Sequence, residues 1–253
     1  MVRTRTKREI ELIATSCQIV ADTLNMLTEY LKPGTSIIEL DARAEAFIKK
    51  QGARPAFKGY MGFPATLCVS VDDEVVHGIP NDRVLQEGQI VGIDCGAEKN
   101  GYYGDHARTF AIGNISEEKQ DLMNATKESL MRGISVATPD NYVSDIGHAI
   151  QTYVENLGYS VVRDLVGHGI GTELHEEPQI PNYGQPKQGY RLREGMCIAI
   201  EPMINLGVKE IKTDSDGWTI RTVDGEASAH FEHTIAITGD GPKILSKGQK
   251  DSG

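Results

Sequence analysis

Apolar side chains near the start of the chain recur at alternating steps of three and four positions. They occupy positions 10, 13, 17, 20, 24, 27 and 31, which align along one face of an α-helix. This spacing predicts a first helix over residues 7–31, ended by Pro33 and Gly34. Ser36 and Glu39 form a capping-box pattern, so a second helix is expected to begin there.

The same order of elements returns later in the chain. Two more helices are predicted, over residues 116–131 and 142–157. Pro139 lies 106 residues after Pro33, and the helix-ending Gly158 lies the same distance after its counterpart at position 52. The equal spacing indicates an internal duplication, with chance similarity between helices bounded by Gly and Pro as the alternative.

Two apolar segments are expected to be strands, and each ends in an acid. Residues 90–94 end at Asp94, and residues 197–201 end at Glu201, 107 positions later. Two helices followed by strands, twice, predict an α+β fold in which two related halves form a curved antiparallel sheet with the helices outside. We expect a single domain over 1–253, with halves of about 1–113 and 114–245.

The composition indicates which kinds of partner and which cellular compartment to expect. The chain has 253 residues, with 26 Lys and Arg against 36 Asp and Glu, for a net charge of −10. An acidic chain is a poor match for nucleic-acid phosphates in bulk, so no DNA partner is expected. The four cysteines form no Cys-x-x-Cys pair, as is typical of reduced thiols. With no apolar run for a signal peptide or a membrane span, a cytoplasmic protein without a membrane partner is expected.

Four basic residues cluster near the N-terminus: Arg3, Arg5, Lys7 and Arg8. Such a cluster is more often a solvated lead-in to a helix than a binding surface. The alternative is contact with an anionic partner such as ribosomal RNA.

Asp94 and Asp105 flank the Asn-Gly pair at 100–101, the strongest two-residue signal for a β-hairpin with a type I′ turn. With the turn centred there, Asp94 faces Ala107, and the two carboxylates are diagonal neighbours on one face of the sheet. Their backbones are then about 7–8 Å apart, a separation from which both can reach one cation. Taken alone, such a pair is more often a feature of a turn than a metal site.

Three further residues stand out from apolar or glycine-rich surroundings. Glu201 and Glu232 each lie in an apolar segment, where a carboxylate needs a counter-charge. His168 sits between glycines, which let a backbone or a ligand approach closely, although an isolated histidine is more often a core or surface residue. Together with Asp94 and Asp105 they form a hard, oxygen-rich set that suits one or two divalent cations.

Several short motifs together resemble those of the type I methionine aminopeptidases. They are Ile-Asp at 93–94, Gly-Asp at 104–105, Gly-His-Gly-Ile-Gly at 167–171, His-Glu-Glu-Pro at 175–178, Ile-Glu-Pro-Met at 200–203, Phe-Glu-His-Thr at 231–234 and Val-His-Gly-Ile-Pro at 76–80. The resemblance extends over nearly the whole chain. It implies the pita-bread fold, a pseudo-twofold α+β domain.

The resemblance also implies two divalent metal ions, such as Fe²⁺, Mn²⁺, Co²⁺ or Zn²⁺. The implied ligands are Asp94, Asp105 and Glu232 for one ion, and Asp105, His168, Glu201 and Glu232 for the other. His77 and His175 match the two histidines of the family that face the substrate without binding metal.

A methionine pocket is implied as well. The matching positions are Phe57, Tyr60, Phe63, Cys68, Leu174 and Trp218. Leu174 stands where an aromatic residue is frequent, and Phe57 where a small Cys is common, so the pocket is expected to differ in shape from that of several members. Ordinary core packing is the alternative interpretation of these apolar residues.

The implied activity is removal of the N-terminal methionine from nascent polypeptides whose second residue is small. A water that bridges two cations is acidified to hydroxide near neutral pH, and this hydroxide would attack the first peptide bond. Glu201 would accept the proton of the water and pass it to the leaving amine. His175 would hydrogen-bond the carbonyl oxygen, and His77 would contact the leaving amine. The expected partners are nascent N-termini, with the ribosome as a further candidate, and the chain is expected to be a monomer.

Two other functions fit part of the pattern. A prolidase or X-Pro aminopeptidase shares the fold and the five implied ligands, but its histidine segments differ and it usually carries an additional N-terminal domain. A non-catalytic binding module of the same fold would have lost ligands, whereas all five are present here.

Overall fold

The computed structural model describes residues 2–248, over which the chain forms four α-helices in two pairs. They are α1 (Lys7–Leu27), α2 (Ile37–Lys50), α3 (Glu117–Ser135) and α4 (Val143–Asn156). The four predicted helices are therefore confirmed. The first is shorter than expected, since the chain tightens after α1 into a 3₁₀ turn, Thr28–Tyr30. Of the expected domain 1–253, residues 1 and 249–253 lie outside the described range.

The start of α2 differs from the prediction. Ser36 is the N-cap residue, but its side chain makes no capping hydrogen bond, so the predicted capping box is wrong. The free amides of Ile37 and Ile38 donate instead to the carbonyl oxygens of Arg83 and Asn81, both at 2.9 Å. A neighbouring loop thus satisfies the groups that a side chain usually caps.

The strands are joined by antiparallel pairing into four sheets. The first two consist of β1 (Arg54–Pro55), β2 (Leu67–Val71), β4 (Ile90–Lys99) and β5 (Tyr102–Ala111), and of β6 (Ser160–Val161), β10 (Met203–Asn205) and β13 (Ser228–His230). The other two consist of β3 (Glu74–Val76), β11 (Ile211–Thr213) and β12 (Ile220–Thr222), and of β7 (Gly167–Gly169), β8 (Glu176–Ile180), β9 (Cys197–Ile200), β14 (His233–Thr238) and β15 (Gly241–Ile244). The predicted antiparallel platform is present and consists of these four sheets.

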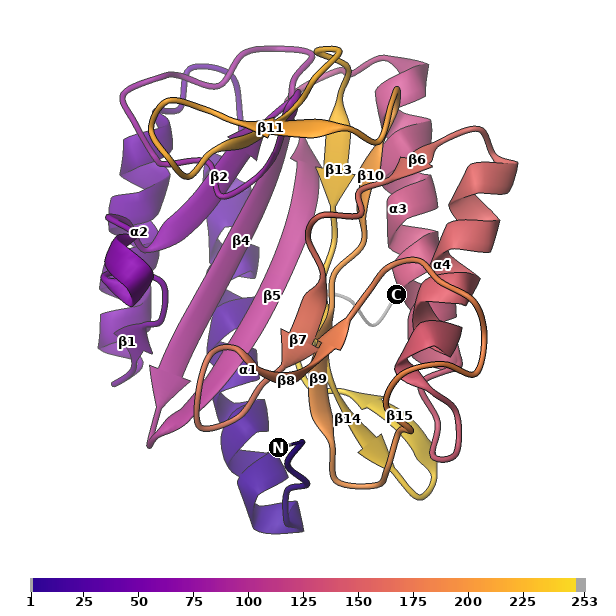
Figure 1. Ribbon diagram of the computed structural model, residues 1–253. Helices are drawn as coiled ribbons and strands as arrows, with labels where there is room; N and C mark the ends of the chain where they lie inside the picture. The colour runs from indigo at the N-terminus through magenta and orange to yellow at the C-terminus, as the bar shows by residue number, and fades with distance from the viewer. Residues whose placement is uncertain (1, 249–253) are drawn as a thin grey trace.

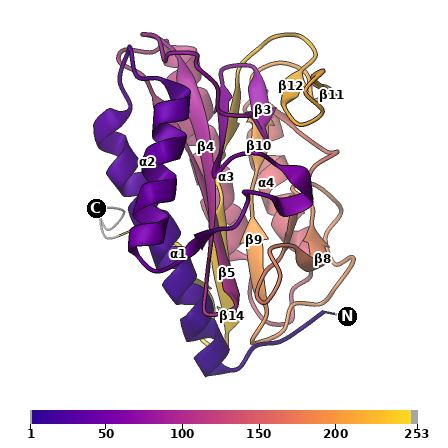
Figure 2. The ribbon, with the colours of Figure 1, turned by 90° about the vertical axis from the view of Figure 1, so that its left-hand side faces the viewer.

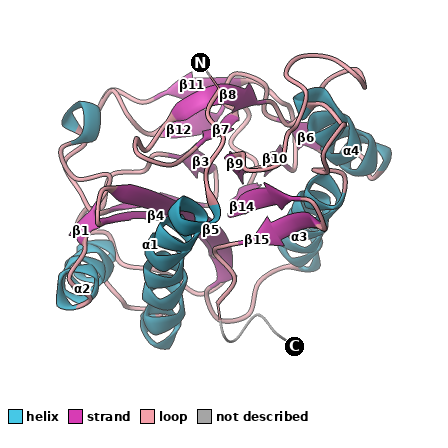
Figure 3. Ribbon diagram, turned by 90° about the horizontal axis from the view of Figure 1, so that it is seen from below, coloured by secondary structure: helices cyan, strands magenta, loops and turns pink. Residues whose placement is uncertain are grey.

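The helices cover one side of the strands. In Figure 1, β4, β5, β13, β10, β9 and β14 stand across the molecule, with α1 and α2 at one end and α3 and α4 at the other. Figure 2 shows the opposite side occupied by β8, β11 and β12. Seen from below, the long strands lie between these two sides (Figure 3). The order helix, helix, strand occurs twice, while the division into related halves stays a prediction.

Buried aliphatic side chains join each helix pair to its own strands. Leu24 and Leu40 pack with Ile93 in one cluster, and Ile146 packs with Ile198 in another. Each is almost fully buried, and each such side chain contributes about 1.5–3 kcal/mol relative to an exposed one. None of the helices in the described part of the chain combines the length and apolar character needed to span a bilayer.

The β4–β5 hairpin has the predicted register. Asn100 and Gly101 both have positive φ, 56° and 81°, as a type I′ turn requires. Asp94 faces Ala107, and Asp105 faces a glycine of β4. The two aspartates therefore project from the same face, as expected from the position of the Asn-Gly pair.

Candidate active site

Three residues from separate strands bring potential metal ligands together. Asp105 lies on β5, His168 on β7 and Glu232 just before β14, and one ligand atom of each lies within 4.8 Å of the others. Asp105 and Glu232 are 3% and 2% exposed. Within the described part of the chain, these three are the group of acids and histidines whose ligand atoms come this close together.

Asp94 and Glu232 each leave a carboxylate oxygen buried with no hydrogen-bond donor. These atoms are Oδ1 of Asp94 and Oε1 of Glu232. An unpaired buried carboxylate oxygen is costly, and a cation satisfies it. The residues present thus fit a divalent metal, because their oxygens are buried, acidic and still without a partner.

The sheet ladder is interrupted where these acids lie. Thr234 replaces ladder bonds with its hydroxyl, which accepts from the amide of Asp105 at 3.3 Å and donates to the carbonyl oxygen of the same residue at 2.8 Å. The amide of Glu232 donates to the carbonyl oxygen of Ala107 at 2.9 Å. One side-chain contact and one backbone hydrogen bond thus connect β5 to the segment of Glu232 and Thr234, at the junction of two sheets.

Glu201 lies directly after β9 and is surrounded by imidazoles. Its Oε1 is 3.7 Å from Nε2 of His168, and its Oε2 is 3.6 Å from Nε2 of His230. Burial raises the pKa of the Glu201 carboxyl, but the neighbouring imidazoles of His230 and His168 outweigh it and bring the pKa below its usual value. Glu201 is therefore ionised at neutral pH and able to accept a proton.

The pKa values of the other three acids, Asp94, Asp105 and Glu232, are raised. Burial raises the pKa of Asp94 to about 7. It also raises the pKa values of Asp105 and Glu232 well above their usual range, and the adjacent carboxylates raise them further. Bringing these groups together costs free energy that a bound cation offsets.

His175 and His77 reach the same cavity from outside the strands. The His175 ring stands edge-on to His168, with centroids 4.3 Å apart, and its Nδ1 lies 2.9 Å from the Tyr60 hydroxyl. Partial burial, followed by the charge of His168, lowers the pKa of His175. His77 directly follows β3 and has a left-handed backbone, with φ of 59°.

One cavity of about 680 Å³ collects every predicted site residue. It is lined by the four acids and one histidine named as ligands, by His77 and His175, and by Phe57, Tyr60, Phe63, Cys68, Leu174 and Trp218. Phe63 and Trp218 form an edge-to-face pair with centroids 5.2 Å apart. Phe57, Phe63, Cys68 and Leu174 are nearly buried and belong to a hydrophobic cluster with Ile13 and Cys17 of α1. The same four side chains therefore pack in the hydrophobic core and also line the cavity.

Sequence reasoning missed three contributors. His230 contacts Glu201, and the Nδ1–H of His106 donates to the carbonyl oxygen of Glu232. The His106 ring also stacks on His233, with centroids 4.6 Å apart. Thr234 holds the backbone of Asp105 through its hydroxyl. His230 and Thr234 flank Glu232 at two-residue spacing, so strand alternation could have placed both on its face.

Only one residue of the N-terminal basic cluster departs from a solvated helix lead-in. Arg3, Lys7 and Arg8 are exposed, but the Arg5 side chain is only 6% exposed and pairs with Glu176. Arg5 therefore belongs to the interior and not to a solvated helix lead-in.

The fold and the site together define a class. Residues 11–239 match the metallopeptidase family M24, and the chain belongs to this family. Within it, the chain is similar to methionine aminopeptidase 1 of Bacillus subtilis (strain 168), at 54% identity over 98% of this chain and 100% of the relative. It is 53% identical to the methionine aminopeptidase of Clostridium acetobutylicum, over 97% of this chain and 99% of the relative.

Solved structures agree with this grouping. Methionine aminopeptidase from Thermotoga maritima superposes with a TM-score of 0.96 at 45% identity, covering 98% of this chain and 100% of that chain. Prolidase from Pyrococcus furiosus gives a TM-score of 0.78 at 27% identity, covering 97% of this chain but 66% of that chain. The fold is the pita-bread fold, as the sequence resemblance implied.

Proposed function

We propose that this metallopeptidase removes the N-terminal methionine from nascent polypeptides whose second residue is small. One observation carries the proposal: a single cavity joins an acidic, histidine-bearing floor to an apolar wall built on Phe63 and Trp218. An apolar pocket of this kind suits an unbranched thioether side chain. The names of the relatives, which cover nearly all of this chain, support the same substrate.

Two divalent ions are proposed as the cofactor, from among Fe²⁺, Mn²⁺, Co²⁺ and Zn²⁺. Asp94, Asp105 and Glu232 would hold one, and Asp105, His168, Glu201 and Glu232 the other. The unpartnered oxygens of Asp94 and Glu232 support carboxylate ligation. When bound, the ions supply Lewis-acid activation of water and of the scissile carbonyl.

Glu201, His175 and His77 would supply the proton transfer and the hydrogen bonds of the reaction. Glu201, kept ionised by its imidazole neighbours, accepts the proton of the attacking water and returns it to the leaving amine. The neutral His175 ring receives the Tyr60 hydroxyl on Nδ1, so its Nε2–H donates to the carbonyl oxygen as charge develops. His77 contacts the scissile nitrogen.

Peptide hydrolysis separates this function from the alternatives. Protein loaded in turn with Mn²⁺, Fe²⁺ or Co²⁺ under reducing conditions is incubated with Met-Ala-Ser and with an Ala-Pro peptide. We expect methionine release from the first and no cleavage of the second. Cleavage of Ala-Pro alone would favour a prolidase, and no cleavage of either a binding module.

We further propose a cytoplasmic location, supported by four cysteines that are all free and buried. The chain is also proposed to be a monomer. A ribosome contact through the basic cluster would involve Arg3, Lys7 and Arg8, which are exposed. Neutralising these three while keeping Arg5 should abolish co-sedimentation with ribosomes without loss of folding. Light scattering tests the monomer.

A further inference from the structure

Arg5 precedes α1 in the sequence, but its side chain is buried next to the loop that carries His175. The segment before α1 runs from the foot of that helix towards the side that carries β8 (Figure 2). The Arg5 amide donates to the carbonyl oxygen of Gly195 at 2.7 Å, which fixes its backbone. Its guanidinium donates to both carboxylate oxygens of Glu176, and the two side chains are 6% and 9% exposed.

The same carboxylate of Glu176 also accepts hydrogen bonds from the loop that precedes β8. Its Oε1 accepts from the amides of Thr172 and Glu173 at 2.8 and 3.2 Å, and from the Thr172 hydroxyl at 3.2 Å. Between these bonded residues stand Leu174 and His175. The carboxylate therefore holds both ends of the short segment that presents a pocket residue and a histidine to the cavity.

Gly171 makes room for the guanidinium. A Cβ at this position would lie 2.3 Å from Nη2 of Arg5, so any other residue would displace the arginine. The Gly171 carbonyl oxygen accepts from the amide of Tyr103 on β5 at 2.8 Å. The loop is thus held between β5 and Arg5, with no space between them for a larger side chain.

We propose that Arg5 is a positioning residue, which acts through Glu176 to hold His175 and Leu174 in the geometry that catalysis requires. This inference rests on the proposed function of His175. A buried ion pair that loses one partner leaves an uncompensated charge. Without Arg5, Glu176 would turn towards solvent and release the amides of Thr172 and Glu173. Lysine is a poor substitute, because a compact ammonium on a flexible stem does not reproduce the planar guanidinium that lies against Gly171.

Steady-state kinetics on the metal-loaded full chain tests the inference. Arg5→Ala should lower kcat about 10²-fold, the cost of a misplacement of about 1 Å in a catalytic group. Arg5→Lys should recover only part of this loss. Arg191→Ala removes an arginine whose ion pair, with Asp140, is exposed and outside the cavity lining, and it should leave kcat and KM within about twofold, as expected for a surface position.

A double-mutant comparison distinguishes positioning of His175 from a general structural role of Arg5. If Arg5 acts through His175, then Arg5→Ala should cost little once His175→Ala is present, because coupled residues are non-additive. Equal cost in both backgrounds would overturn the inference. Added guanidinium at millimolar concentration should partly restore kcat in Arg5→Ala and have no effect on Arg5→Lys, where the space is filled.

Hydrogen exchange gives a readout that does not depend on activity. The amides of Thr172 and Glu173 should exchange at least tenfold faster in Arg5→Ala, while amides in α3 keep their protection. Unchanged exchange and wild-type kcat would refute the inference. Failure of the proposed function is distinct, since the unaltered protein would then release no methionine.

Discussion

His175 projects into the cavity from an exposed loop, and its ring rests on the Tyr60 hydroxyl and the His168 ring. Since it contributes no oxygen or nitrogen to the close ligand cluster, its removal should leave metal binding intact. His175→Ala should lower kcat about 10²–10³-fold, as loss of one donor to a developing oxyanion does. Turnover of Met-Ala-Ser and metal content by elemental analysis are the two measurements.

His148→Ala is the matched control. His148 is exposed on α4 and remote from the cavity lining, so turnover should stay at the level of the unaltered protein. A His175→Ala protein that turned over normally, or that lost its metal, would contradict the role assigned to His175.

Gly96 on β4 determines where one wall of the methionine pocket stands. A Cβ there would lie 2.6 Å from Cε1 of Phe57 and 3.0 Å from the Cβ of Ala56. Gly96→Ala should therefore push the Phe57 ring into the cavity, raise KM for Met-Ala-Ser, and destabilise the protein by about 1–3 kcal/mol through overpacking. Kinetics and thermal unfolding measure the two effects.

Gly92→Ala provides the comparison within the same strand. Its Cβ would find no atom nearer than 3.7 Å, which is ordinary contact, so KM should be unchanged. Equal KM values for the two variants would show that the Phe57 ring is not confined by Gly96.

At the level of elements, α1 sits on the hairpin that carries Asp94 and Asp105. A Cβ on Gly104 would lie 2.3 Å from the Cys17 amide nitrogen in α1, and the Ser16 hydroxyl donates to the Tyr102 carbonyl oxygen at 2.8 Å. Because backbone atoms cannot step aside, Gly104→Ala should lift α1 and shift Asp105. We expect at least about 1–3 kcal/mol of destabilisation, or about 2–4 °C in Tm per kcal/mol, together with weaker metal binding.

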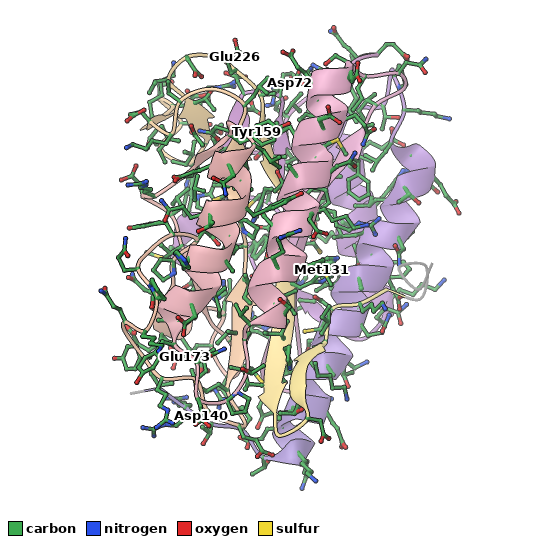
Figure 4. All side chains as sticks on the ribbon, turned by 90° about the vertical axis from the view of Figure 1, so that its right-hand side faces the viewer. Asp72, Met131, Asp140, Tyr159, Glu173 and Glu226 are labelled. Carbon is green, nitrogen blue, oxygen red and sulfur yellow. The ribbon has the colours of Figure 1, made fainter. Side chains whose placement is uncertain are left out.

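Gly133→Ala tests whether any helix contact would have the same effect. Gly133 is where α3 meets α4, two helices that lie side by side in Figure 4. A Cβ there would lie 2.9 and 3.0 Å from side-chain carbons of Ile150 and 3.2 Å from one of Ile146, and all three are side-chain atoms that can shift. This variant should lose less stability and keep its metal affinity. Equal loss of metal affinity in both variants, measured by competition with a chelator, would contradict a specific link between α1 and Asp105.

The elements predicted well are those whose cause is local. Helical periodicity predicted all four helices, and the Asn-Gly pair predicted the register of the hairpin because a type I′ turn permits one pairing. The capping box at Ser36 was wrong because a distant loop supplies the acceptors. Thr234, His230 and Arg5 were missed as contributors to the site because each acts through a contact far away in the sequence. The ligand and pocket residues share one cavity as predicted, and their individual roles stay predictions.

At the scale of the whole molecule, part of the net charge of −10 is concentrated in one place. Asp94, Asp105, Glu201 and Glu232 account for four of the acids and share one cavity. Two divalent ions would bring the charge to about −6 and neutralise that cavity. The acidity is therefore in part a requirement of the site, and its cost should become visible when metal is removed.

Metal-free protein should lose stability as the pH rises from about 6.5 to 8. Asp94, with a folded pKa of about 7, and Asp105 and Glu232, with raised values, hold protons in the folded state that the unfolded chain releases near pH 4. Because the folded state then binds more protons, the free energy of unfolding falls with pH. His106, whose pKa burial lowers, acts in the opposite direction but only below about pH 6.5.

Metal reverses this dependence, because divalent ions bind the ionised carboxylates and bind them more tightly as protons leave. Thermal unfolding of chelator-treated and Mn²⁺-loaded protein should thus give Tm values that diverge as the pH rises. The histidines and thiols outside the site contribute equally to both samples, so the difference in Tm isolates the buried acids. Parallel curves would mean that these carboxylates are not the groups that metal neutralises. A difference that widens with pH, and that Asp105→Asn reduces, would tie the stability of the whole fold to the charge of its cavity.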